Sequence, residues 1–398
     1  MSPTTGSTLA RWRQRMLDLG LNPDIDGHDF LIIRHTDSLE EYKRWWAFPP
    51  RSDSKVNKVD PAKIAKIPDA LVRRYVQDHI TNARVFTNPK AIRALEKRVG
   101  RFFVHVRAAP NRVCTAKDPI IVNSGNEITN YNEITIKDGG YIEITTACKF
   151  EAQVITKIQG GAAGRKYDVY IVGKPGRDAK DGVNPPAAGQ AIAGKDAKCD
   201  CCGGAPERKA TDGAPGKPGT NGFDATHDAT VGEEGPNVYF FIHESFNGSG
   251  GLTFLNQGGN GGNGGRGGNG AIGQQGGNGG NGIRCGGITA TGGTGGTGGR
   301  GGGGGNGSNG KNGGNGGTLE VWVPDPVFSD IIVTNGRAPG GLAGAKGRYG
   351  IGGEGGKGGN YGGKHGERGL DGPSDGDPGR PGEPGEKGTS FVNGRMVS

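Results

Sequence analysis

Residues 258–282 read GGNGGNGGRGGNGAIGQQGGNGGNG, and residues 292–316 read GGTGGTGGRGGGGGNGSNGKNGGNG. In both stretches a glycine returns at every third position, and the phase shifts by one between Gly282 and Gly292. Polyproline II makes one turn per three residues and has no internal hydrogen bonds. Packed side by side, such helices can bond to one another, and glycine leaves a face without a Cβ for close approach. The period therefore predicts a bundle of polyglycine helices of the polyproline-II type.

The same period extends through much of the C-terminal half. It recurs over 213–222, 341–362, 363–372 and 376–388. The third residue is often asparagine, where a flexible linker would carry serine; the examples at one phase are Asn260, Asn263, Asn269, Asn278 and Asn281. The run Gly301–Gly305 has no side chain on any face, so we expect it in a middle layer with neighbours around it.

Breaks in the glycine pattern predict turns. They fall at 271–275, 283–291 and 308–312, which would divide this region into four helices, and the register slips at 362–363 and 372–376 would mark further turns. Loops held on a rigid scaffold are common binding sites. The candidate binding residues are Ala271, Ile272, Gln274, Gln275, Ile283, Arg284 and Ile288.

These repeats resemble those of the tip adhesins on the long tail fibres of T-even-type phages. They are also similar to the snow flea antifreeze protein and, more distantly, to the glycine-rich domain of the Obg GTPases. The resemblance covers roughly residues 213–388 and concerns architecture. It implies a polyglycine-II bundle, and it specifies no function, because one fold serves many functions.

The remaining chain predicts a multidomain protein. Residues 1–101 have apolar residues at helical spacing and several helix caps, which indicates a small basic α-helical domain containing the pair Trp45-Trp46 as core. Residues 102–172 alternate with period two, which predicts an all-β sandwich or short solenoid. In 173–398, strands near 237–255, 319–334 and 390–392 interrupt the glycine-rich bundle, and we expect them to form the base from which it projects.

Charge is concentrated at the N-terminus. Residues 1–110 hold 20 Lys/Arg and 12 Asp/Glu, a net of +8, which equals the net charge of the whole chain. Because these charges form no cluster, we expect a solvated helical surface and no nucleic-acid partner. We also expect no secretory signal peptide and no membrane span, so export would occur by lysis, on a particle or by another route outside the general secretory pathway.

The chemistry-bearing residues give no enzyme signature. The seven histidines are scattered, with no recognisable catalytic spacing, and we expect no enzyme activity and no cofactor. The six cysteines include Cys199, Cys201 and Cys202, which are dense enough for a metal site but lack the usual pair spacing. Two disulfides closing glycine-rich loops, or free thiols, are the favoured alternatives to metal.

Three functions follow as hypotheses. The first is a recognition or adhesion protein whose scaffold presents loops to a cell-surface protein or glycan, with residues 1–101 attached to a partner. The second is a toxin or effector that uses its N-terminal domains on a membrane or host partner. The third is ice binding through the row Thr291, Thr294 and Thr297, although small residues filling the outward position explain that row more simply. For residues 376–388 the G-X-Y pattern also permits a collagen-like trimer, which the preceding register slips disfavour.

Overall fold

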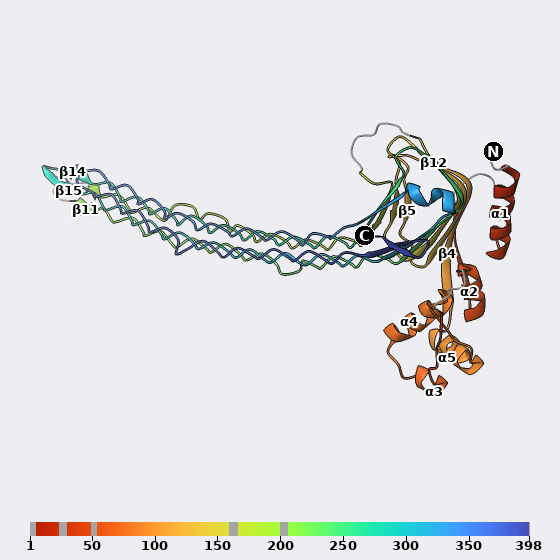
Figure 1. Cartoon of the computed structure of the whole chain (residues 1–398). Helices are drawn as coiled ribbons and strands as arrows, with labels where there is room; N and C mark the ends of the chain where they lie inside the picture. Colours follow the sequence, from red (N-terminus) through yellow and green to blue (C-terminus); the bar gives the residue numbers. More distant parts are fainter. Residues whose placement is uncertain (1–4, 24–29, 49–53, 159–165, 200–205, 398) are drawn as a thin grey trace.

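The computed structural model describes the chain except for residues 1–4, 24–29, 49–53, 159–165, 200–205 and 398. In the described part, a few helices accompany many strands in mixed sheets, which agrees with the expected multidomain fold class at that level. The molecule has a base, which holds the helices and the two large sheets, and a long thin shaft that projects from the base (Figure 1).

The α-helices come from the first hundred residues and begin at the expected caps. Ser38 Oγ accepts a hydrogen bond from Glu41 N, and Asp60 and Asn88 each accept one from the N–H two residues on, directly ahead of a proline at the first helical position. The helices are α1 (Thr5–Asp18), α2 (Leu39–Trp46), α3 (Pro61–Ile64), α4 (Asp69–Ile80) and α5 (Pro89–Val99), with β2 (Lys55–Val56) paired to β3 (Arg84–Val85) between them.

The helical segment shares a core with the first large sheet. Strand β1 (Phe30–Thr36) pairs antiparallel with the start of β4 (Phe102–Cys114). Trp45 and Trp46 are buried in a cluster that also contains Val104 of β4. The tryptophan pair therefore packs in a core, and contacts cross the expected domain boundary at residue 101.

From Phe102 onward, the chain alternates between two sheets. The eight-stranded sheet has the order β1-β4-β6-β8-β12-β16-β18-β19, and the five-stranded sheet has the order β17-β13-β9-β7-β5. All neighbours from β4 to β18, and all neighbours in the five-stranded sheet, pair in parallel. The strands are β5 (Ile120–Val122), β6 (Glu127–Ile136), β7 (Ile142–Ile144), β8 (Cys148–Lys157), β9 (Val169–Val172), β12 (Val238–Gly248), β13 (Leu252–Gln257), β16 (Thr318–Trp322), β17 (Ile331–Asn335), β18 (Thr389–Val392) and β19 (Arg395–Val397), with the 3-10 helix η1 (Asp325–Asp330) before β17.

One hydrophobic core lies between the two sheets. Phe240 of β12 stacks on Phe150 of the neighbouring strand at 4.6 Å between ring centroids, and meets Phe254 of the opposite sheet edge-on at 5.1 Å. All three side chains are fully buried. The strands after residue 236 therefore complete the core that residues 102–172 begin, so the β-structure extends beyond that range.

The shaft is made of three excursions from the base. In the first passes the chain crosses from the five-stranded to the eight-stranded sheet within a few residues, at 123–126 and 145–147. After β9, β13 and β17, by contrast, the chain leaves the base, extends along the shaft and returns to the eight-stranded sheet. The outgoing segments are 173–197, 258–282 and 336–359, and the returning segments are 211–236, 292–317 and 363–388.

The two sheets impose a two-layer order on the shaft. The outgoing segments follow β9, β13 and β17, which are neighbours in the five-stranded sheet, and the returning segments enter β12, β16 and β18, which are neighbours in the other sheet. Hydrogen bonds join each outgoing segment to the next outgoing one, as from Gly182 N to Arg266 O, and likewise each returning segment, as from Gly219 N to Arg300 O. Further bonds, such as Gly268 N to Phe223 O, join the layers.

Close approach of the backbones explains the glycine period. The bonds between segments repeat at every third residue, with N···O distances mostly near 2.8 Å. A Cβ built on Gly302 would lie 2.1 Å from Thr220 O, a separation that no real side chain can adopt. Gly301–Gly305 belongs to the middle returning segment and bonds to segments of both layers, so neighbours surround it as expected, but the shaft has two layers and no middle layer.

Two of the expected turns are wrong. Residues 271–275 continue straight, because Ala271 N donates to Thr220 O and Gln274 N donates to Lys217 O. Pro185 and Pro186 of the first excursion lie opposite this stretch, and the register of bonds from that excursion runs from Gly182 N to Arg266 O and resumes with Ala191 N to Gln275 O. The glycine pattern is therefore broken here without a turn. Residues 308–312 also continue straight, so the region holds two segments and not four.

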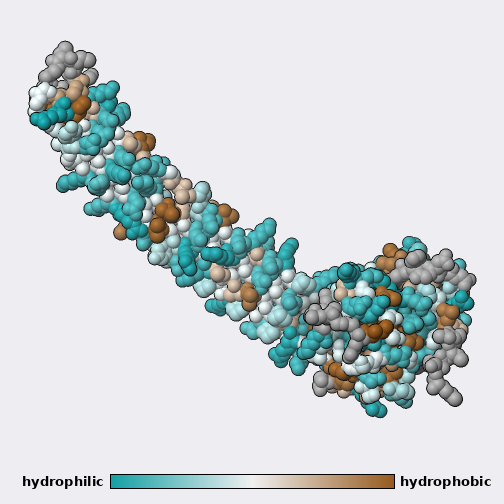
Figure 2. Space-filling view, turned by 90° about the horizontal axis from the view of Figure 1, so that it is seen from above, coloured by the Kyte–Doolittle hydropathy of each residue, from teal (hydrophilic) through white to brown (hydrophobic). Residues whose placement is uncertain are grey.

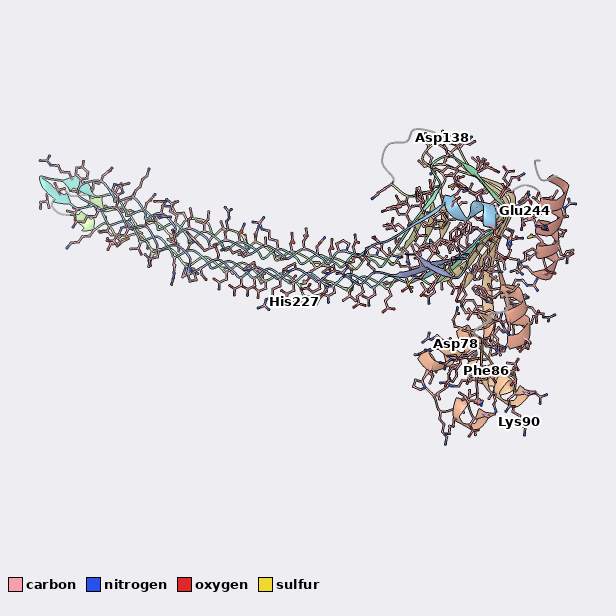
Figure 3. The ribbon with its side chains drawn as sticks, viewed as in Figure 1. Asp78, Phe86, Lys90, Asp138, His227 and Glu244 are labelled. Carbon is pink, nitrogen blue, oxygen red and sulfur yellow. A yellow bond between two sulfur atoms is a disulfide. The ribbon has the colours of Figure 1, made fainter. Side chains whose placement is uncertain are left out.

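The register slip at 372–376 is a bulge and not a turn. Gly372 N bonds to Gly350 O and Gly376 N bonds to Gly347 O, so four residues lie opposite three. A similar bulge at 226–230 faces Ser308, where Thr226 N and Thr230 N bond to carbonyls three residues apart. His227 projects from the shaft in that bulge (Figure 3). The slips at 282–292 and 362–363 do mark turns.

Proline is confined to the edges of the two layers. Neither middle segment, 258–282 or 292–317, contains one, whereas the last returning segment carries Pro378, Pro381 and Pro384. A proline has no N–H, so it is tolerated where the backbone faces solvent. The G-X-Y stretch, residues 376–388, is one of these edge segments. It bonds to segment 336–359 of the same chain, as from Gly382 N to Gly341 O.

Among the described helices none is long and apolar enough to cross a bilayer.

Candidate functional site

The far end of the shaft gathers the turns of all three excursions (Figure 1). The first excursion ends in β10 (Lys198–Cys199) and β11 (Pro206–Arg208), and the second in the hairpin β14 (Ile283–Cys285) and β15 (Ile288–Ala290). Gly286 and Gly287 form the hairpin turn with φ of 52° and 91°, a left-handed conformation that favours glycine. The third excursion turns at Tyr361 and Gly362, both also with positive φ.

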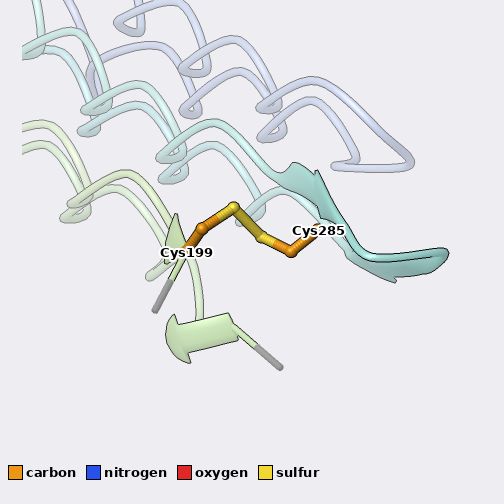
Figure 4. Close-up of a disulfide and its surroundings, with 2 residues drawn as sticks. All are labelled: Cys199 and Cys285. Carbon is orange, nitrogen blue, oxygen red and sulfur yellow. A yellow bond between two sulfur atoms is a disulfide. The ribbon is translucent and has the colours of Figure 1, made fainter. Parts of the chain in front are cut away.

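A disulfide locks two of these turns together. Cys199 of β10 is bonded to Cys285 of β14, 86 residues away in sequence (Figure 4). Cys199 therefore offers no thiolate to a metal, which removes it from the candidate ligands, while Cys201 and Cys202 lie outside the described residues. Cys114 and Cys148 are buried free thiols in the base.

Three of the predicted binding residues lie at this tip. Arg284 and Ile288 are exposed, with 50 % of Ile288 accessible, and Ile283 is half-buried opposite Ala290. Tyr361 is 55 % exposed in the adjoining turn of the third excursion, and no pattern in the sequence singled it out as a binding residue. The tip thus presents aliphatic, aromatic and cationic side chains on turns that a disulfide and the shaft hold in place.

The other four predicted binding residues lie along the shaft and not at a turn. Ala271 is buried, Gln275 is exposed, and Gln274 uses its Oε1 to accept a hydrogen bond from Lys217 N at 2.9 Å. Ile272 is 47 % exposed on an otherwise largely polar surface, where apolar side chains are scattered (Figure 2). The structure therefore does not bring these four together with the tip residues.

A second cluster of polar residues, in the base, was missed by the sequence analysis. Glu151 of β8 is buried and forms ion pairs with Arg15 Nη2 at 2.9 Å and Lys149 Nζ at 2.8 Å, and its Oε1 lies 3.4 Å from His243 Nε2. Burial alone would raise the pKa of the Glu151 carboxyl, but Arg15, Lys149 and His243 outweigh it and hold that pKa well below its usual range. Burial lowers the pKa of Lys149 to about 8, and the Glu151 charge opposes this shift only in part.

This cluster connects the N-terminal helices to the sheet. Arg15 on α1 also donates to Trp45 O at 2.5 Å, and Lys149 donates to Ala47 O at the end of α2. The cluster opens into a pocket of about 650 Å³, whose walls include Phe241 and Trp322. No local sequence spacing could reveal it, because its members lie on α1, β8 and β12.

Within the described residues, no group of three or more His, Cys, Asp or Glu side chains is placed to hold a metal ion. Comparison with known proteins identifies no relative, since no family model, no curated protein and no solved structure matches the chain.

Proposed function

We propose that this is a non-enzymatic recognition or adhesion protein whose tip binds a cell-surface protein or glycan. In this proposal the shaft is a polyglycine-II bundle, the paired sheets form a short β-solenoid, and the helical segment attaches the base to a partner. The observation that carries the proposal is the meeting of three excursions at one point, where Cys199 and Cys285 clamp the turns. Turns on a rigid support are suited to binding, because little conformational freedom is lost when they engage a target.

The polyglycine-II assignment is supported by the hydrogen-bond period of three. In such a helix, successive N–H groups point in three directions, so each can reach a different neighbour. At ~3.1 Å per residue, a segment of 25 residues such as 258–282 would span roughly 75 Å. The shaft would hold the tip at that distance from the base, clear of the surface to which the base attaches.

The test uses the full-length protein, labelled with a fluorophore, against a panel of bacterial and eukaryotic cells by flow cytometry. The variant Arg284→Ala/Ile288→Ala removes the exposed tip side chains, and we expect it to weaken binding by tenfold or more. Ile272→Ala is the matched control, because Ile272 is nearly as exposed as Ile288 but lies along the shaft. Binding that survives the tip change and is lost with Ile272→Ala would exclude the tip as the binding site.

A further inference from the structure

The base contains a pocket lined by charged and aromatic side chains. Its walls come from the C-terminal end of α1 (Arg15 and Asp18), the end of α2 (Ala47), β8, β12 and β16. The volume of about 650 Å³ lies within the range of small-molecule sites. Lys149 and Glu151 form its floor, with 3 % of each side chain exposed, so the polar groups are fixed by packing.

A bulge in β12 turns two ionisable side chains to the same side of the sheet. The pairing with β8 shifts between Ile242 and Ser245, which leaves His243 and Glu244 opposite a single residue. Ile242 and Phe246 enter the core between the sheets, while His243 meets Glu151 and Glu244 meets Arg11 on α1. Figure 3 places Glu244 beside α1. Bulges often re-aim side chains at functional sites. Here the alternation of β12 already places His243 beside Phe241 at the pocket wall, and the bulge adds Glu244 to the same side.

Aromatic rings line the pocket next to these groups. Phe241 and Trp322 are register partners on β12 and β16, with ring planes 11° apart, and the His243 ring lies 13° from the plane of Phe241. Trp322 is half-buried, whereas Trp12, Trp45 and Trp46 are buried elsewhere. Lys149 Nζ lies 4.8 Å from the Phe241 centroid on this wall. A row of near-parallel rings offers an apolar surface to a flat ring-shaped ligand.

The charges in the pocket balance. Arg15 and Lys149 are matched by Asp18 and Glu151, so the formal charge of these four groups is zero. A phosphate-bearing ligand would bring charge that nothing in this set compensates. Arg15 can donate hydrogen bonds, Asp18 can accept them, and His243 has a second ring nitrogen besides the one facing Glu151. This combination suits a neutral molecule with several hydroxyl groups and an apolar ring face.

We propose that this pocket is a binding site for a neutral saccharide ring, which stacks on Trp322 and hydrogen-bonds to His243, Arg15 and Asp18. The site is separate from the tip and does not depend on what the tip binds. It gives the base its own affinity for glycans.

Calorimetric titration of the full-length protein with D-glucose, D-galactose, D-mannose, N-acetyl-D-glucosamine and their disaccharides tests the proposal. We expect saturable binding of at least one of these probes. Trp322→Ala and His243→Phe should each weaken it by fivefold or more, the second because it keeps a ring but removes the hydrogen bond. Phe391→Ala is the control, since Phe391 lies beside Glu320 on the same sheet face but does not line the pocket. Arg284→Ala/Ile288→Ala at the tip should leave the affinity unchanged.

Adenosine monophosphate serves as the planar, anionic competitor probe. Binding of this nucleotide without binding of any saccharide would overturn the proposal, as would saccharide binding that Trp322→Ala and His243→Phe leave unchanged. Circular dichroism of each variant separates a lost site from a lost fold. If Trp322→Ala unfolds the base, the milder Trp322→Leu keeps the apolar contact with Phe241 and should still weaken binding.

Discussion

The side chain of Asn306 accepts a hydrogen bond from the backbone N–H of Asp377, 71 residues along the chain, at 2.7 Å. The same separation recurs at Asn309, Asn312 and Asn315, whose Oδ1 atoms accept from the neighbouring segment. Aspartates of the first excursion do the same for the second, as from Asn263 N to Asp178 Oδ1. The outward Asn and Asp side chains thus accept hydrogen bonds from backbone N–H groups that the bonds donated by glycines do not use.

We expect Asn309→Ala/Asn312→Ala to destabilise the shaft. Each change removes the acceptor of one backbone N–H, and because both sites are exposed to water we expect about 0.5–1 kcal/mol per bond. Thermal unfolding followed by circular dichroism measures this. Thr297→Ala, at the same phase of the same segment but without an amide oxygen to lose, should leave the melting temperature nearly unchanged. Equal effects of the asparagine and threonine changes would contradict this role.

Substitution by alanine should cost far more stability at Gly302 than at the adjacent Gly303. A Cβ on Gly302 would lie 2.1 Å from Thr220 O, whereas the nearest atom to a Cβ on Gly303 is Pro373 Cγ at 3.3 Å. Gly302→Ala must force the segments apart, and we expect a loss of about 3 kcal/mol or more, at the upper end of overpacking costs. Gly303→Ala should change stability by less than about 1 kcal/mol. Denaturant unfolding of the two variants, monitored in the far ultraviolet, gives the comparison.

Cys285→Ser should loosen the tip and leave the base intact. The bond closes a separation of 86 residues, and cross-links of this kind typically contribute 2–4 kcal/mol. Hydrogen exchange should therefore accelerate in 283–290 and in the adjoining ends of 173–197 and 258–282. Wild-type protein in reductant should show the same pattern. Faster exchange in β8 and β12 instead would mean that the bond stabilises the whole molecule.

Glu151→Gln should reduce the acid sensitivity of the base. The folded-state pKa of Glu151 is depressed, so the carboxylate contributes stability that is full above its unfolded pKa, near 4.5, and is lost as pH falls below it. The variant should be less stable at pH 7 by about 3 kcal/mol, because Arg15 and Lys149 lose their partner. Its stability should also fall less steeply than that of the wild type between about pH 4.5 and 3. Urea unfolding across this range, followed by tryptophan fluorescence, provides the measurement.

Lys149 should make the stability of the base depend on pH in the alkaline range. Burial lowers its pKa to about 8, below the unfolded value of 10.5, so the unfolded state binds more protons between these values. Its contribution to stability therefore rises with pH from about 8 to 10.5. Lys149→Met should remove this rise, and urea unfolding at pH 7.5, 9 and 10 compares the variant with the wild type. An unchanged slope would assign the effect to another group.

The sequence by itself determined where backbones approach closely. Glycine at every third position allows contacts that any Cβ would block, as Gly302 shows, and it identified most of the segments that form the shaft. The first outgoing segment, 173–197, does not keep the period and was not identified in this way. The caps at Ser38, Asp60 and Asn88 likewise fixed the starts of α2, α3 and α5, because a cap acts over only two or three residues.

Only the tertiary structure decided which segments are neighbours and where the chain turns. Residues 271–275 interrupt the glycine pattern just as residues 283–291 do, but only the second break is a turn, because Ala271 N and Gln274 N keep their bonds to Thr220 O and Lys217 O. The pairing of Cys199 with Cys285 and of Glu151 with His243 joins residues 86 and 92 positions apart. No local pattern records such pairs, since they depend on how successive passes of the chain stack in the two sheets.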